Sequence, residues 1–140
     1  MRALFYAAVL AIAAPIAAGA QTFRAVNDLY VVPLTRSTFE VIEAHGEGPQ
    51  GIWCAAAEYA ERRLGAKGRI YVLEARGPSR NTPGRKSVVF TTNAANLTVE
   101  PFKSVSLSTS QVGMGLPIPH AIQFCRKDEF ELSDRLFRRN

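Results

Sequence analysis

The clearest pattern of apolar and polar positions lies between residues 53 and 64. Apolar side chains recur there at the spacing of an α-helix, and charged side chains occupy the opposite side. The apolar positions are Trp53, Ala56, Ala57, Ala60 and Leu64, and the charged positions are Glu58, Glu61 and Arg62. Gly65 follows directly, and glycine is typical of the residue that ends a helix. The pattern predicts one amphipathic helix, preceded by a Gly- and Pro-containing loop at 45–51.

Runs rich in β-branched and aromatic residues predict strands on both sides of this helix. They pair into two antiparallel hairpins, one before the helix and one after it. The first hairpin joins 30–32 to 38–44 through a turn at 33–37, and the second joins 69–76 to 87–92 through a long loop at 77–85. Both loops contain the proline or glycine that such turns require.

The pattern is weaker towards the C-terminus. Residues 97–99 and 105–107 predict two further strands, and Pro119 favours the start of a short helix that runs through Cys125. Residues 112–119 are too rich in glycine and proline for an assignment.

This order of elements predicts an α+β fold in which one main helix packs on an antiparallel sheet. The chain has 140 residues, of which 47% are hydrophobic and 21% charged. That length suits one core and excludes a two-domain or membrane-channel architecture. We assign 21–125 to a single small domain and 126–140, which is charged at both ends, to a tail or a short helix.

The N-terminus has the pattern of an export signal. Arg2 is followed by an uncharged, Ala-rich run over 3–20 that ends in Ala-Gly-Ala, so we predict a signal peptide cleaved before Gln21. A retained membrane anchor is the alternative, although the run is at the short limit of a spanning helix and contains Pro15. The short Ala-rich signal indicates a bacterial protein that is periplasmic or secreted, with no transmembrane segment after cleavage.

Export also determines how the cysteines are interpreted. The chain contains two, Cys54 and Cys125, and an even count in an oxidising compartment predicts a disulfide. The bridge would close a loop of about 70 residues and stabilise the fold by about 4 kcal/mol in the chain-entropy model.

A catalytic role for Cys54 is the alternative. Residues 53–56, Trp-Cys-Ala-Ala, resemble the nucleophile helix of papain-like and peptidoglycan-cleaving amidases. That resemblance implies a hydrolase of cell-wall peptide or a related amide, in which Cys54 attacks and His120 or His45 accepts its proton. A bridge to Cys125 would remove this nucleophile, so an enzyme is the less favoured hypothesis.

Metal and nucleotide sites are also weakly indicated. The two cysteines pooled with His45 and His120 match no short zinc-binding spacing. Residues 46–51 spell G-x-G-x-x-G, but the preceding strand carries Glu40, where a central parallel strand would be apolar. We therefore predict no metal and no cofactor.

Basic residues give the remaining signal. The chain carries a formal net charge of +5, and removal of Arg2 with the signal leaves +4. One group surrounds the end of the predicted helix: Arg62, Arg63, Lys67 and Arg69. A second group surrounds the second hairpin loop: Arg76, Arg80, Arg85 and Lys86. The hairpin group is the candidate binding site, with a solvated surface as the alternative. The loop has no aromatic residue for base stacking, so nucleic acid is not expected as a partner.

Several short motifs carry a family resemblance. They are Trp-Cys-Ala-Ala at 53–56, Tyr-Ala at 59–60, Arg-Ile-Tyr-Val at 69–72, Gly-Pro-Ser at 77–79 and Gly-Arg-Lys-Ser at 84–87. With a cysteine near position 125, this combination resembles a group of uncharacterised small secreted proteins of alphaproteobacteria. The resemblance implies neither an activity nor a ligand.

Together these patterns predict a non-enzymatic exported domain. We expect it to contact an envelope component or a protein partner, with 77–85 as the contacting loop.

Overall fold

The computed structural model describes residues 21–126. Six strands form one antiparallel sheet in the spatial order β1-β2-β3-β5-β4-β6. The strands are β1 (Phe23–Arg24), β2 (Tyr30–Pro33), β3 (Thr38–Ile42), β4 (Arg69–Pro78), β5 (Lys86–Thr91) and β6 (Gly115–Pro117). The two predicted hairpins are the pairs β2–β3 and β4–β5. The predicted signal peptide and the tail beyond Arg126 lie outside the described residues.

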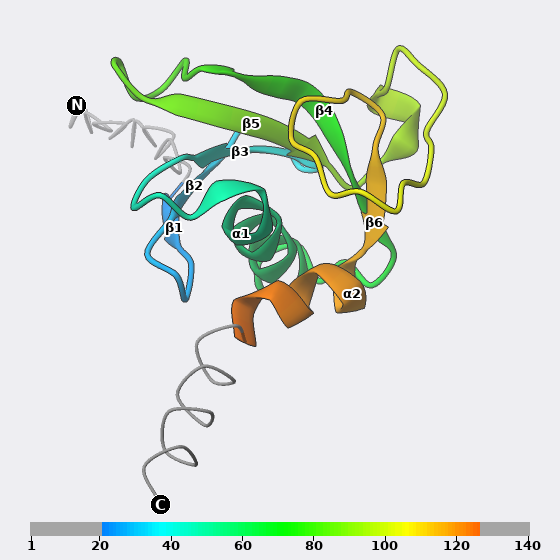
Figure 1. Cartoon of the computed structure of the whole chain (residues 1–140), viewed down its shortest axis with the longest axis horizontal. Coiled ribbons are helices and arrows are strands. Elements are labelled where there is room, and N and C mark those ends of the chain that lie inside the picture. Colours follow the sequence, from blue (N-terminus) through cyan, green and yellow to red (C-terminus); the bar gives the residue numbers. More distant parts are fainter. Residues whose placement is uncertain (1–20, 127–140) are drawn as a thin grey trace, which may run out of the picture.

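The helices make two further layers beneath the sheet. Helix α1 (Gly48–Arg62) crosses one face of the sheet, and α2 (Ile118–Ile122) packs on the opposite side of α1 (Figure 1). A 3-10 turn, η2 (Gln123–Arg126), continues α2, and another, η1 (Ala94–Asn96), follows β5. The predicted α+β fold, with one main helix on an antiparallel sheet, is confirmed.

Aromatic rings join α1 to the sheet. Trp53 meets Phe90 edge to face with ring centroids 4.9 Å apart, and Phe39 meets Tyr59 at 4.7 Å. Such pairs add to the gain from burial. Phe39 lies on β3 and Phe90 on the neighbouring β5, directly opposite each other in the sheet. The core therefore lies between this face and α1.

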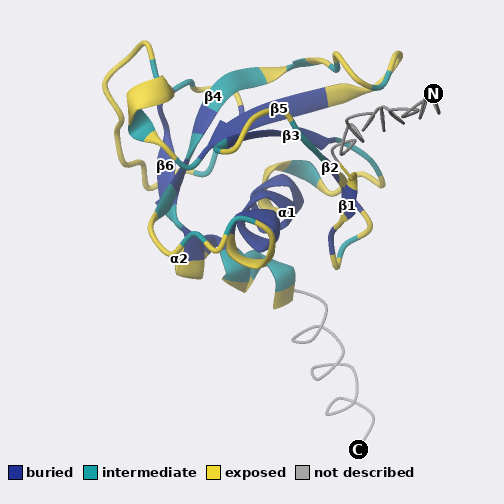
Figure 2. Ribbon diagram, turned by 180° about the vertical axis from the view of Figure 1, so that it is seen from behind, coloured by how far each residue is buried: buried dark blue, intermediate teal, exposed yellow. Residues whose placement is uncertain are grey.

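The middle of α1 is buried on every side, because a second layer covers what would have been its polar face (Figure 2). All ten residues from Gly51 to Ala60 are buried. Glu58, predicted on the solvent side, is only 7% exposed, so that prediction is wrong. The prediction failed because the one-sided pattern of α1 does not show that α2 and η2 pack on its charged side.

The structure also differs from the predictions in where some elements begin and in which segments are strands. Helix α1 begins at Gly48, inside the predicted loop, with Pro49 in its first turn. Proline suits that position, because the first N–H groups of a helix have no helical acceptor and proline has no N–H to leave unpaired. Residues 97–99 and 105–107 are not strands, and Val99 and Val105 are exposed there. The predicted helix near Pro119 is confirmed, as α2 and η2.

Candidate functional site

The four basic residues predicted as a binding site do not share one environment. Arg76 donates two hydrogen bonds to the carboxylate of Glu43, one of them 2.8 Å long, and Arg80 pairs with Glu74. The hydrogen bond from Arg76 lowers the pKa of Glu43. Two of the four charges are thus compensated, which sequence spacing did not predict.

Arg85 and Lys86 differ from that pair. Both are exposed where the loop enters β5, and neither forms an ion pair within the described part of the chain. The loop that joins β4 to β5 projects from one end of the sheet (Figure 1). The available positive charge of the hairpin therefore comes from these two residues.

A buried carboxylate holds the loop in place. Glu40, 1% exposed on β3, accepts a 2.6 Å hydrogen bond from Ser79 Oγ and further bonds from Asn81 Nδ2 and the backbone N–H of Arg80. Burial alone would raise the pKa of Glu40, but hydrogen bonds from Ser79, Ser87 and Asn81 and from that backbone N–H bring it below its ordinary value. The loop is thus anchored to a neighbouring strand through an ionised group.

The loop also closes on itself. The backbone N–H of Ser79 donates to the carbonyl of Arg85 at 2.9 Å, and the N–H of Arg85 donates to the carbonyl of Thr82 at 3.2 Å. Gly84 has φ +79°, a conformation that favours glycine in a turn. These contacts make 79–85 an ordered loop.

A groove of about 460 Å³ lies between this loop and the sheet, and we call it the hairpin groove. Tyr30, Val32 and Ile42 lie on the same face of the sheet as Glu40, opposite α1, because Val32 pairs with Glu40 and the others alternate with them. All three line the groove, together with His45 and the loop residues Asn81, Thr82 and Arg85. Its volume is within the range of small-molecule sites.

The disulfide predicted from the cysteine count is present. Cys54 and Cys125 are bonded, so α1 is joined to η2 across 71 residues of sequence. Cys54 thus has no thiol with which to act as a nucleophile. His120 is exposed on α2, where its ring packs against Phe124 at 5.7 Å. The hydrolase hypothesis would require this bond to be reduced first.

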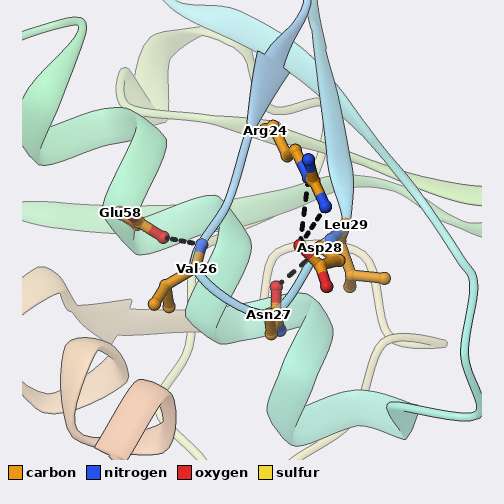
Figure 3. Close-up of polar contacts among 6 residues, drawn as sticks. All are labelled: Arg24, Val26, Asn27, Asp28, Leu29 and Glu58. Carbon is orange, nitrogen blue, oxygen red and sulfur yellow. Dashed lines mark hydrogen bonds and ion pairs between the residues drawn. The ribbon is translucent and has the colours of Figure 1, made fainter.

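Glu58 lies beside the disulfide but is engaged by other groups. Its carboxylate accepts a 2.7 Å hydrogen bond from the backbone N–H of Val26, in the turn between β1 and β2 (Figure 3), and pairs with Arg62 at 2.9 Å. Asn27 of the same turn donates from Nδ2 to the carbonyl of Gly51. The turn is therefore attached to α1 at two points.

The pooled cluster of two cysteines and two histidines that was considered from the sequence does not form among residues 21–126. The group that comes closest consists of Cys54, Glu58 and Cys125, with ligand atoms within 4.8 Å of one another, and neither histidine joins it. Zinc binds thiolates, whereas these two sulfurs are bonded to each other. The G-x-G-x-x-G segment at 46–51 runs into the first turn of α1, which begins at Gly48. The strands of the described sheet pair antiparallel, so the parallel βαβ unit of a dinucleotide site is not present there.

Comparisons of the chain with known protein families, with characterised proteins and with solved structures find no match. The resemblance to small secreted proteins therefore stays a prediction. None of the helices within 21–126 has the length and apolar character needed to cross a bilayer.

Sequence reasoning identified Arg85 and Lys86 but missed the groove beside them. Tyr30 and Ile42 were assigned to strands without a role, and His45 was considered only as a base or a metal ligand. His45 has φ +59°, which is uncommon for a residue other than glycine and turns the chain sharply after β3. No local signal places these residues beside a loop about 40 positions away, since it is Glu40 that makes the link.

Proposed function

We propose that the protein is an exported, non-enzymatic binding domain whose β4–β5 hairpin contacts an anionic component of the bacterial envelope. One observation carries the proposal: Arg85 and Lys86 are exposed cations that form no ion pair among the described residues, on a loop that Glu40 anchors. Lys86 is near enough to Glu43 to help lower the pKa of that carboxyl, but the carboxylate is hydrogen-bonded to Arg76. An ordered loop loses little conformational entropy on binding, so its charges act from fixed positions.

The disulfide supports the export part of this proposal. Disulfides persist in the periplasm and outside the cell and are rare in the cytoplasm of most organisms. The Ala-rich segment before Gln21 supports the same location. The intact mass of the protein recovered from the periplasm, before and after reduction, tests both features. Loss of residues 1–20 and a gain of two hydrogens on reduction are expected, whereas a retained N-terminus or free thiols would contradict the proposal.

Charge neutralisation tests the binding surface. We expect Arg85→Gln/Lys86→Gln to lower the affinity for vesicles containing phosphatidylglycerol by about 30-fold, because each cation near an anionic surface contributes about 1 kcal/mol. Sedimentation of the protein with the vesicles measures this affinity. The matched control is Arg36→Gln/Lys67→Gln, which removes the same charge from two exposed cations elsewhere. Purified peptidoglycan provides a second arm, since an anionic cell-wall polymer is the other envelope component considered.

Equal weakening by both double variants would show that only net charge matters and would refute the hairpin as the contact. Unchanged binding of Arg85→Gln/Lys86→Gln to both vesicles and cell wall would refute it as well. The salt dependence should fall with the hairpin variant, because fewer ionic contacts are then screened.

A further inference from the structure

The hairpin groove combines an apolar surface with one cation. Val32 and Ile42 contribute aliphatic groups from the sheet, and Tyr30, which is 50% exposed, contributes a ring that remains accessible. Arg85 contributes the positive charge from the loop. Among the described residues no carboxylate lines the groove, because Glu40 beneath the loop is turned to Ser79 and Asn81.

Polar groups of the loop complete the lining. Asn81 and Thr82 add side chains that can donate or accept hydrogen bonds, and His45 adds an imidazole from the other side. A small-molecule site typically has this composition, a mainly apolar lining with a few fixed polar groups that orient the ligand. The Arg85 fork suits a carboxylate or a phosphate, which it can bind with two parallel hydrogen bonds.

From these features we infer that the hairpin groove binds an amphiphilic anion, with a carboxylate or phosphate at Arg85 and a ring or short acyl chain over Tyr30, Val32 and Ile42. The inference deepens the proposed function and rests on it for the role of Arg85. It adds that Arg85 and Lys86 are not equivalent: Arg85 lines the groove, whereas Lys86 does not. A free small molecule and the anionic end of a lipid share this chemistry.

The purified protein with its disulfide intact is titrated with 1-naphthoate and, separately, with its neutral analogue 1-naphthamide, and backbone amide shifts are followed by NMR. We expect naphthoate to bind saturably and to shift amides around Tyr30, His45 and Thr82. Arg85→Gln should weaken it about tenfold, the effect expected when a hydrogen-bonded charge is removed. Lys86→Gln is the matched control, with the same charge change outside the groove, and should alter binding by less than about twofold.

Tyr30→Ser tests the apolar part, because the half-exposed ring can be removed with little effect on the core. It should weaken naphthoate binding, and unchanged affinity would contradict the apolar part of the groove. If phosphatidylglycerol vesicles displace bound naphthoate and also bind Tyr30→Ser less tightly, the natural anion is a lipid headgroup with its adjoining chain. If the vesicles bind Tyr30→Ser as tightly as the unmutated protein, the natural anion is a free molecule.

Three outcomes would overturn the inference. Equal affinity for naphthoate and naphthamide would refute the claim that the groove selects an anion. Equal affinity for naphthoate and inorganic phosphate would refute the claim that the ligand has an apolar part. Absence of naphthoate binding in a protein that still binds the vesicles through Arg85 and Lys86 would refute the groove and leave the proposed function standing. Vesicle binding that is lost in Arg85→Gln/Lys86→Gln and kept in the unmutated protein would support the proposed function, whatever the result for the groove.

Discussion

Removal of the disulfide should cost a large part of the stability of the domain. The bond between Cys54 and Cys125 spans 71 residues, and a closed loop of that size stabilises by about 4 kcal/mol through the lost entropy of the unfolded chain. The double variant Cys54→Ala/Cys125→Ala should therefore unfold at a temperature lower by roughly 15–30 °C, given about 4–8 °C per kcal/mol for a domain near this size.

Thermal and urea unfolding followed by circular dichroism measure this effect. The unmutated protein reduced with dithiothreitol is the control, because it keeps both cysteine side chains and loses only the bond. It should match the double variant to within about 1 kcal/mol, since the small void left by truncating buried Cys54 adds a minor cost. The urea dependence should also steepen, because an open unfolded chain exposes more surface.

A stability loss below about 1 kcal/mol in both samples would refute the reasoning. It would mean that the packing of α2 and η2 on α1 holds the three layers together without covalent help, or that the reduced unfolded chain keeps residual structure around Cys54. Amide exchange in η2 separates these two explanations, because only the first keeps those amides protected.

Three further effects follow from single side chains. Glu58→Gln should lower the free energy of unfolding by about 1–2 kcal/mol and speed amide exchange at Val26, whereas Glu61→Gln, an exposed neighbour, should stay within about 0.5 kcal/mol. The lowered pKa of Glu40 means that its stabilisation is present above the pKa of the unfolded carboxyl and is lost as the pH falls through the lower folded pKa. The stability difference between the unmutated protein and Glu40→Gln should therefore shrink in acid urea titrations, and a difference independent of pH would contradict this role. Gly113→Ala should destabilise by about 1–3 kcal/mol in urea unfolding, because residue 113 has φ +89° and a new Cβ would lie 2.8 Å from a methyl group of Val99; an unchanged midpoint would contradict this strain.

The sequence predicted the parts of the fold that depend on local periodicity. The helix around Trp53 and the two hairpins follow from spacing and turn chemistry, and the bond between Cys54 and Cys125 follows from an even cysteine count in a chain predicted to be exported. The strands proposed at 97–99 and 105–107 were wrong, because short β-branched runs form strands only where a neighbour pairs with them.

The candidate site was predictable only in part. The sequence showed the basic residues around the hairpin loop but not their partners, because Arg76 pairs with Glu43, 33 residues away, and Glu40 contacts the loop from another strand. Glu40 was used as evidence against a central parallel strand, and β3 is indeed antiparallel to both of its neighbours. The burial of Glu40 was not predicted, because no feature of the local pattern distinguishes a solvated glutamate from one that accepts several hydrogen bonds.

The strand order affects whether copies of this protein can associate through the edges of their sheets. The outermost strands are the shortest, β1 with two residues and β6 with three, so little open backbone is left to recruit another chain. Pro33 extends β2 past the end of β1 with a residue that has no N–H, and backbone hydrogen bonds from Phe102 and Gly115 close part of the other border. Both margins of the sheet therefore resist edge-to-edge growth, which protects against aggregation a chain whose inner strand β5 contains Ser-Val-Val-Phe-Thr at 87–91.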